Sequence, residues 1–119
     1  HHTTAGLLRS LKLCYAAGAD LDLKNNFGRD ALANAKYFNR GDAVAFLEFA
    51  TASEVAGLLL GELRQPRSLV VAFYEEDLLT KRACLVLQDV DLEGMGVTSS
   101  LKRRRILNEL NPNAAQVPR

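Results

Sequence analysis

Turn-forming residues recur along this chain at short intervals, and no segment between two of them is long. Glycines, an Asn-Asn pair, Pro66 and an Asn-Pro pair punctuate the sequence from Gly18 to Pro112, and residues of these types favour turns. Between them apolar residues follow helical spacing, and no useful length shows the alternation of a half-buried strand. Helices of roughly 8 to 12 residues separated by turns form an all-α domain or a helical repeat. The sequence therefore predicts an all-α fold.

The first 50 residues predict one helix, a turn-rich connector and a pair of helices. The first helix covers 6–17 and ends at Gly18, because glycine adopts the positive φ of a helix end at least cost. Asp30 is expected to cap the next helix, since its carboxylate can accept a backbone N–H of the first turn. A break at 39–41 separates that helix from another, whose apolar stripe comprises Val44, Leu47 and Ala50.

This half of the chain resembles the ankyrin repeat. Residues 16–25, Ala-Ala-Gly-Ala-Asp-Leu-Asp-Leu-Lys-Asn, are similar to the end of one repeat, and Gly28, Leu32 and Ala35 fall at turn and core positions of the next. Asp-Ala-Leu-Ala at 30–33 replaces the family's usual Thr-Pro-Leu-His, as is typical of a degenerate last repeat that closes the stack. Because one repeat of about 33 residues cannot bury its faces alone, the resemblance implies further repeats upstream or stabilisation in some other way.

The resemblance assigns 1–50 to the C-terminal repeats of a partial ankyrin array and implies a partner-binding surface there. Repeat stacks bind partners through the tips of their finger-like connectors. The candidate tip residues are Lys24, Asn25, Asn26, Phe27 and Arg29. Phe27 either anchors a partner as an exposed aromatic or folds back onto the next helix or the second half. His1 and His2 either begin the earlier repeat or remain from an affinity tag.

The second half, 51–111, predicts five helices. They cover 53–63, a segment that opens at Pro66, 81–87, 89–95 and a longer one from 99 or 100 to 110. Ser53 or Thr51 can cap the first of these helices and Thr80 the third. The last helix stops before Pro112, because proline disfavours helical geometry in the residue that precedes it.

This half resembles the SAM (sterile alpha motif) domain, a bundle of five helices. Residues 85–98, Leu-Val-Leu-Gln-Asp-Val-Asp-Leu-Glu-Gly-Met-Gly-Val-Thr, are similar to the family's Leu-Leu-x-Leu-Thr-x-x-Asp-Leu-x-x-Leu-Gly-Ile-Thr, and 102–110 to its His-Arg-x-Lys-Ile-Leu-x-x-Ile. Leu101 stands where many members have glycine, which argues against a very close backbone approach of a partner there. The chain thus resembles adaptor proteins with ankyrin repeats followed by a SAM domain. Residues 112–119 are expected to form a flexible tail.

Charge is segregated in the second half. The expected acidic surface comprises Glu75, Glu76, Asp77, Asp89, Asp91 and Glu93. Six acids minus the bases Lys81 and Arg82 leave a net charge of −4 in this segment. The expected basic surface at the start of the last helix comprises Lys102, Arg103, Arg104 and Arg105. The SAM resemblance implies that two such surfaces join subunits head to tail, with complementary charge steering the encounter and setting the register.

Other interpretations of these charges stay open. Charge runs are usually solvated faces, in which an exposed pair contributes only about 0–1 kcal/mol. The bases at 102–105 would also suit RNA phosphates, although no aromatic is interleaved with them to stack on nucleotides. As a nuclear-import signal they are a weak match. The chain would otherwise be a structural subunit of a larger assembly, clamped by its neighbours.

The sequence lacks the residue patterns of an enzyme. His1 and His2 are its only histidines, and neither a metal-ligand spacing nor a phosphate-loop signature occurs. No catalytic residue, metal or cofactor is therefore expected, and the predicted function is a protein–protein interaction scaffold or adaptor. No apolar run in the sequence is long enough to cross a bilayer.

Two further expectations concern the cysteines and the connector. Cys14 and Cys84 lie in apolar helical segments without a CxxC pattern. We expect both to be small core residues in a reduced, cytoplasmic setting. The connector at 51–53 lacks a Pro- or Gly-rich linker, so the two halves should pack together rather than swing freely. The residues expected to contact the first helix of the second half are Phe46, Phe49 and Ala50.

Overall fold

The computed structural model describes residues 4–115 of the chain. Over this range all regular structure is helical, which confirms the predicted all-α class. The elements are α1 (Thr4–Ala16), α2 (Ala31–Tyr37), α3 (Gly41–Ala52), α4 (Glu54–Leu60), α5 (Arg67–Glu75), the 3₁₀ helix η1 (Ala83–Val86), α6 (Asp89–Gly94), α7 (Ser100–Leu110) and α8 (Pro112–Ala115).

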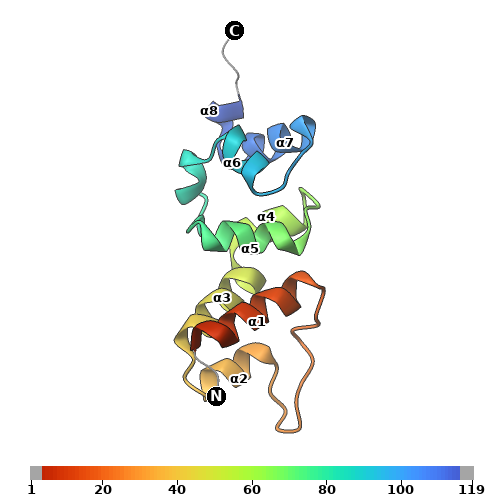
Figure 1. Ribbon diagram of the computed structural model, residues 1–119, viewed down its shortest axis with the longest axis vertical. Helices are drawn as coiled ribbons and strands as arrows, with labels where there is room; N and C mark the ends of the chain where they lie inside the picture. The colour runs from red at the N-terminus through yellow and green to blue at the C-terminus, as the bar shows by residue number, and fades with distance from the viewer. Residues whose placement is uncertain (1–3, 116–119) are drawn as a thin grey trace.

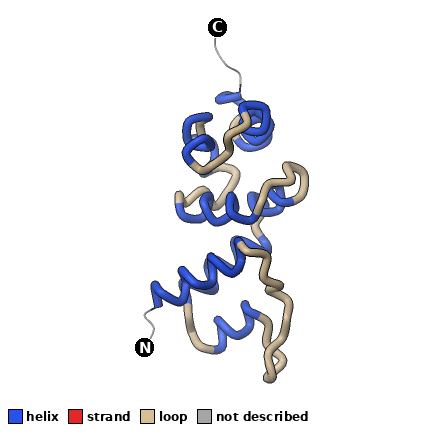
Figure 2. Tube along the Cα trace, turned by 45° about the vertical axis from the view of Figure 1, so that its right-hand side comes forward, coloured by secondary structure: helices blue, strands red, loops and turns tan. Residues whose placement is uncertain are grey.

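The helices are stacked along one long axis (Figures 1 and 2). α1, α2 and α3 lie at one end, α4 and α5 form the middle, and η1, α6, α7 and α8 lie at the other end. The principal extents are 58 × 25 × 23 Å and the radius of gyration is 15.7 Å. A compact chain of this length would have a radius of gyration of about 13.5 Å. The elongated shape therefore separates the surfaces of the two ends.

Local sequence explains how the N-terminal helices begin and end. Gly18 follows α1 with a φ of 99°, the left-handed conformation that glycine adopts without strain, as predicted. Asp30 caps α2, also as predicted, because its Oδ1 accepts the Ala33 N–H at 2.8 Å. Asn39 takes a left-handed φ of 56° between α2 and α3, a conformation that asparagine tolerates better than most residues.

Three of the C-terminal helices begin where a hydroxyl side chain accepts a first-turn N–H group. Ser53 and Thr80, both predicted caps, accept first-turn N–H groups of α4 and η1 at 3.0 and 3.1 Å, and Ser99 accepts one of α7 at 3.3 Å. Thr51, the alternative cap for α4, instead lies inside α3 and donates to the Leu47 carbonyl. The predicted helix at 81–87 is shorter than expected, because only the four residues of η1 form a turn of 3₁₀ helix.

Asn111 ends α7 and ties it to the rest of the fold. Its buried side chain donates a 2.7 Å hydrogen bond from Nδ2 to the Leu87 carbonyl. The residues that follow, Pro112–Ala115, form the short helix α8, so the segment expected as a flexible tail begins with a helix. Residues 116–119 lie outside the described part of the chain.

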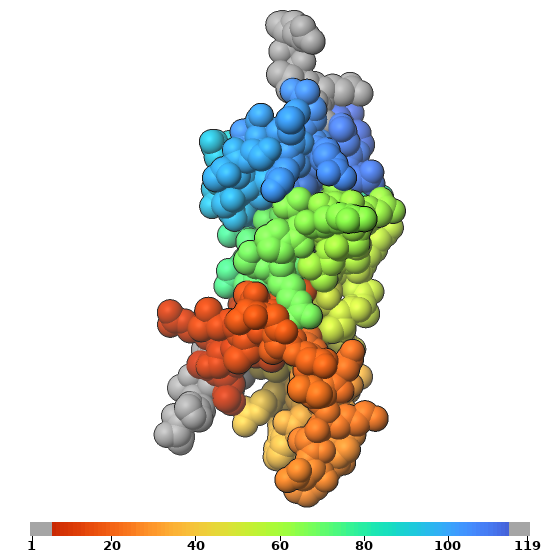
Figure 3. Space-filling model, turned by 90° about the vertical axis from the view of Figure 1, so that its right-hand side faces the viewer, coloured from red at the N-terminus to blue at the C-terminus, as the bar shows by residue number. Residues whose placement is uncertain are grey.

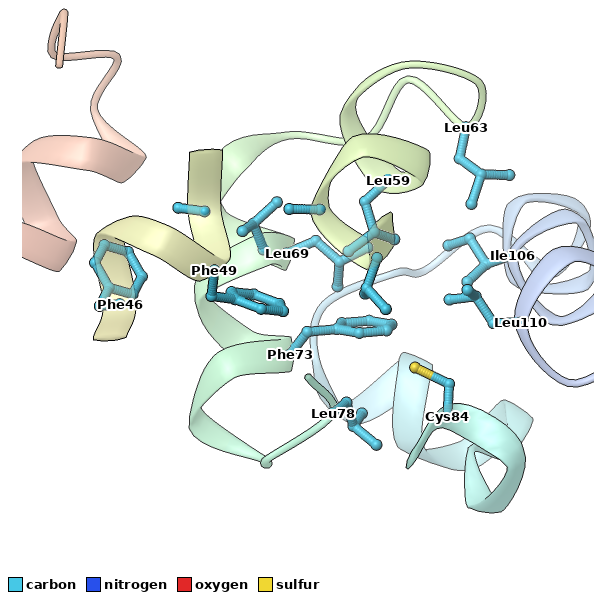
Figure 4. Packing of buried hydrophobic residues seen from close by; sticks show 14 of the residues in the cluster. Phe46, Phe49, Leu59, Leu63, Leu69, Phe73, Leu78, Cys84, Ile106 and Leu110 are labelled. Carbon is cyan, nitrogen blue, oxygen red and sulfur yellow. The ribbon is translucent and has the colours of Figure 1, made fainter. Parts of the chain in front are cut away.

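One hydrophobic core runs through the stacked layers (Figure 4). Phe46 of α3, Phe73 of α5 and Ile106 of α7 are completely buried. Full burial of such a side chain stabilises the fold by about 1.5–3 kcal/mol. The two predicted halves therefore share one core.

Aromatic side chains of α3 and α5 form one part of the contact between the halves. The Tyr74 ring lies 5.2 Å from the Phe46 ring and 5.5 Å from the Phe49 ring, between centroids. Phe46, Phe49 and Ala50 are buried, as the packing of the halves requires. The predicted contact of α3 with α4 is present, and α3 also packs against α5, which carries Tyr74 and was not predicted as a partner.

Polar contacts reinforce this junction. Arg67 of α5 donates from Nη1 to the carbonyls of Tyr15 and Ala19 at 3.1 and 2.7 Å. Its guanidinium carbon also lies 4.8 Å from the Tyr15 ring centroid. Lys12 of α1 forms a 3.4 Å ion pair with Glu75 of α5. The orientation of the N-terminal helices is therefore fixed by hydrogen bonds as well as by apolar packing.

The two cysteines differ in environment. Cys84 is completely buried, as predicted, and burial raises the pKa of its thiol to about 11. Cys14 is exposed on α1, so the expectation that it is a core residue is wrong. Both thiols are free. Leu13, the residue before Cys14, is 66% exposed and lines a hollow together with Val71 and Glu75 of α5.

Within the described residues, no single helix is long and apolar enough to span a membrane. α3 and α4 taken together would meet the same criteria of length and composition, but they are bent by 53° where they join.

Candidate interaction surfaces

A groove lies between the end of α5, η1 and α6. Its volume is about 530 Å³. The acidic residues that line it are Glu75, Glu76 and Asp91. The apolar residues that line it are Ala72, Leu78, Val86, Leu87, Val90 and Met95. We call this feature the acid-rimmed groove.

Two valines leave apolar surface uncovered at the acid-rimmed groove. Val86 is 73% exposed and Val90 is 67% exposed. Val86 belongs to the 3₁₀ turn η1 and Val90 to the first turn of α6, and the residues that these two short helices bury are Cys84 and Leu92 instead. Exposed apolar residues ringed by acids are the composition of a protein-binding surface, with an apolar centre and a polar rim. Both valines were missed from the sequence, which shows them only as apolar residues of short predicted helices.

The predicted acidic residues do not all serve one surface. Glu93 is exposed on α6, and Asp77 is exposed after α5 with a left-handed φ of 59°. Asp91 has a local role besides lining the groove, because its Oδ2 accepts the Gln88 N–H at 2.9 Å and caps α6. Asp89 is bound to Arg103.

Arg103 is not part of an exposed basic surface. Its side chain is buried, its Nε donates to Asp89 Oδ1 at 2.8 Å, and its Nη1 donates to the Val97 and Thr98 carbonyls at 2.9 and 3.0 Å. These bonds tie α7 to α6 and to the loop between them. The prediction that groups Arg103 with its neighbours overlooked helix geometry: position 103 lies on the same face as the buried Ile106 and Leu107.

The exposed basic surface consists of the other three predicted residues and one leucine. Lys102, Arg104 and Arg105 are exposed on α7, and Leu101 is 69% exposed beside them. None of these three bases forms an ion pair within residues 4–115. We call these four residues the basic end surface. It combines an apolar side chain with uncompensated positive charge.

The acid-rimmed groove and the basic end surface lie on different sides of the molecule. In Figure 1 the end of α5 and η1 lie on the left, whereas the start of α7 lies on the right. Figure 3, which looks at the right-hand side, shows α7 beside the loop between α4 and α5. One copy of the chain can therefore present both surfaces at once to two neighbours.

The connector between α1 and α2 projects from the opposite end of the molecule, where Figure 3 shows it in orange. Asn25 organises its tip, because its Oδ1 accepts the N–H groups of Phe27 and Arg29 at 2.9 and 3.1 Å. Asn25 Nδ2 also donates to Asn34 Oδ1 at 3.1 Å, which anchors the tip to α2. Phe27 is 77% exposed, so it does not fold back into the core.

Two aromatic rings contact the guanidinium of Arg29 at this tip. Its guanidinium carbon lies 3.5 Å from the centroid of the Tyr37 ring and 5.1 Å from that of Phe27. Phe38 meets Tyr37 edge to face at 5.0 Å. The predicted tip residues Lys24 and Asn26 are exposed. Tyr37 and Phe38 were missed from the sequence, because they stand at the end of α2 and join the tip only through the fold.

Within 4–115, no three histidine, cysteine, aspartate or glutamate side chains are grouped closely enough to hold an ion. The pKa values of Tyr15 and Tyr74 are raised mainly by burial, so both phenols stay protonated near neutral pH. Tyr74 belongs to the junction between the halves, and Tyr15 to the core beneath it.

Comparisons of the chain with protein-family models, with curated proteins and with solved structures found no match.

Proposed function

We propose that this chain is a non-catalytic interaction module in which an ankyrin-like N-terminal half binds a partner protein and a SAM-like C-terminal half joins copies of the chain head to tail. The observation that carries the second part is the pairing of two dissimilar surfaces. The acid-rimmed groove exposes Val86 and Val90, and the basic end surface exposes Leu101 among three bases. The first surface carries acids around exposed valines and the second carries bases around an exposed leucine, so the two surfaces are complementary in charge.

The geometry favours head-to-tail association over a symmetric dimer. A symmetric dimer uses the same patch on both copies, which would set acid against acid or base against base. Contact between the groove of one copy and the basic end surface of the next uses two different patches. Such a contact forms an open chain unless the rotation closes it into a ring.

The expected affinity is modest. Complementary charge mainly raises the association rate and fixes the register of a contact. Leu101 of one copy, placed between Val86 and Val90 of the next copy, supplies apolar burial. Small protein–protein contacts typically have micromolar dissociation constants, which correspond to a binding free energy of about −8 kcal/mol. Added salt should weaken the association, because the charges at its rim are exposed to solvent.

RNA binding by the same bases is less well supported. Arg103 uses its N–H donors in hydrogen bonds inside the fold, so three bases rather than four face solvent. No aromatic side chain accompanies them on α7 to stack on bases.

Sedimentation velocity over a wide concentration range tests the self-association. The wild-type chain should grow in size with concentration, and Arg104→Glu/Arg105→Glu should stay monomeric. Arg9→Glu/Lys24→Glu is the matched control, because it also reverses two exposed bases but at the other end of the molecule. A wild-type chain that stays monomeric at every concentration would contradict the self-association, as would equal behaviour of both variants.

A further inference from the structure

The cluster at the connector tip holds an arginine between aromatic faces. The guanidinium of Arg29 stacks on Tyr37, at 3.5 Å between guanidinium carbon and ring centroid, and faces Phe27 at 5.1 Å. A guanidinium stacked in this way keeps its N–H donors in its own plane, along its edges. The rings therefore fix the plane of Arg29 while leaving its hydrogen-bonding edges open.

None of those donors is used within the described residues. Arg29 forms no ion pair there, and the hydrogen bonds it makes involve only its backbone. The adjacent carboxylate, Asp30, already accepts the Ala33 N–H as the cap of α2. Arg29 is partly buried by its neighbours, so water competes less well for its charge than at a fully exposed base.

The aromatic side chains around Arg29 are unusually open. Phe27, Tyr37 and Phe38 are 77%, 62% and 54% exposed. The backbone at Phe27 is held in place before any ligand arrives, because Asn25 bonds the backbone of the tip and links it to Asn34 of α2. Aromatic residues and arginine are the types that most often dominate the binding energy of an interface, and a preorganised site loses less entropy on binding.

Local charge indicates the class of partner. Between residues 20 and 40 there are four bases and three acids, a net charge of +1. A nucleic acid would need several uncompensated bases to displace its counterions. One unpaired guanidinium instead matches one carboxylate, which it can bind through two parallel hydrogen bonds.

We propose that Phe27, Arg29, Tyr37 and Phe38 form a docking site for a protein segment that carries a glutamate or aspartate next to a bulky apolar side chain. The carboxylate binds the free edge of Arg29, and the apolar side chain covers Phe27 or Phe38. This inference names the partner class for the N-terminal half and rests on that part of the proposed function. It is independent of the self-association of the C-terminal half.

The test uses two blocked hexapeptides, Gly-Ser-Glu-Phe-Ser-Gly and Gly-Ser-Gln-Phe-Ser-Gly, titrated into the ¹⁵N-labelled full chain. The signals followed are the Arg29 Nε–Hε group and the backbone amides of Phe27 and Tyr37. We expect the glutamate peptide to shift them with an affinity at least about fivefold higher than the glutamine peptide, since charged hydrogen bonds are about twice as strong as neutral ones. Arg29→Lys should remove most of this preference, because it keeps the charge but loses the planar fork. Lys81→Gln, which removes an exposed base in the other half of the chain, should leave it unchanged.

The possible failures are distinct. Equal binding of both peptides would keep partner binding at the tip but overturn the acidic class of partner. No shift with either peptide up to about 10 mM, which means a binding free energy weaker than about −2.7 kcal/mol, would overturn both the site and the partner-binding part of the proposed function. Preferential movement of the same signals by oligouridylate would reassign the cluster to RNA. Sedimentation of the same samples reports self-association separately.

Discussion

Arg103 donates a 2.8 Å hydrogen bond from Nε to Oδ1 of Asp89, and this bond joins the beginning of α7 to the beginning of α6. The side chain of Arg103 is 11% exposed and that of Asp89 is 55% exposed. A sequence that reads as four equivalent bases thus contains one structural arginine and three surface residues. Their substitution should have different consequences.

Arg103→Ala should lower the free energy of unfolding by about 1.5–3 kcal/mol, the range for hydrogen bonds to charged groups. The variant loses its bonds to Asp89 and leaves the Val97 and Thr98 carbonyls without their donor. Arg104→Ala is the matched control and should change stability by less than about 0.5 kcal/mol, as is usual for exposed positions. Urea unfolding of both variants measures the difference. Equal midpoints would show that Arg103 is not structural.

The sequence predicted several local features because short-range chemistry determines them. The Asp30 cap, the left-handed Gly18 and the end of α7 before Pro112 all depend on a few neighbouring residues. The misassigned positions depend on which face of a helix meets the rest of the fold. Arg103 turned inward and Cys14 turned outward, and neither direction follows from apolar or charged runs alone.

Only part of the candidate surfaces could be found in the sequence. The acidic and basic segments were visible as charge runs, and the tip as a turn-rich connector. The groove required α5, η1 and α6 to be placed in space, so its exposed valines were missed. Tyr37 contacts Arg29 although the two residues are 8 positions apart and the cap of α2 lies between them. The sequence pattern does not reveal this contact.

Arg67→Ala should weaken the junction between the halves. The variant loses two hydrogen bonds to main-chain carbonyls, at Tyr15 and Ala19, and we expect a loss of about 1–3 kcal/mol in unfolding free energy. In ¹⁵N relaxation the wild-type chain should tumble as one elongated body, because its halves share a core. Separate rotational correlation times for residues 6–50 and 54–110 of the wild type would contradict this arrangement.

Tyr15→Phe should raise the free energy of unfolding by about 1 kcal/mol. The Tyr15 hydroxyl is buried and has no hydrogen-bond partner among residues 4–115, and leaving such a group unsatisfied typically costs about 1–3 kcal/mol. Tyr37→Phe, at a ring that is 62% exposed, is the control and should be neutral. Thermal unfolding compares the two variants. A Tyr15→Phe protein less stable than wild type would show that its hydroxyl is satisfied in solution.

The two thiols should react at very different rates with a disulfide reagent at pH 8. Cys14 is exposed and should react at once, whereas Cys84 is buried with a pKa of about 11 and should react only on unfolding. Cys14→Ser should remove the fast phase. Because the native state holds the Cys84 proton more tightly than the unfolded state, with its ordinary pKa of 9.0, this group should lower stability as pH rises from about 9 to 11. A slow single phase, or rapid reaction of both thiols, would contradict the assignment.

The most direct test of head-to-tail association mixes two variants that each lack one surface. Glu76→Lys/Val90→Lys disables the acid-rimmed groove, and Arg104→Glu/Arg105→Glu disables the basic end surface; all four positions are exposed. Sedimentation velocity should show each variant alone as a monomer and their equimolar mixture as a dimer that grows no further, because each copy keeps one working surface. A mixture that stays monomeric while the wild-type chain associates, or variants that each associate like the wild type, would contradict this account.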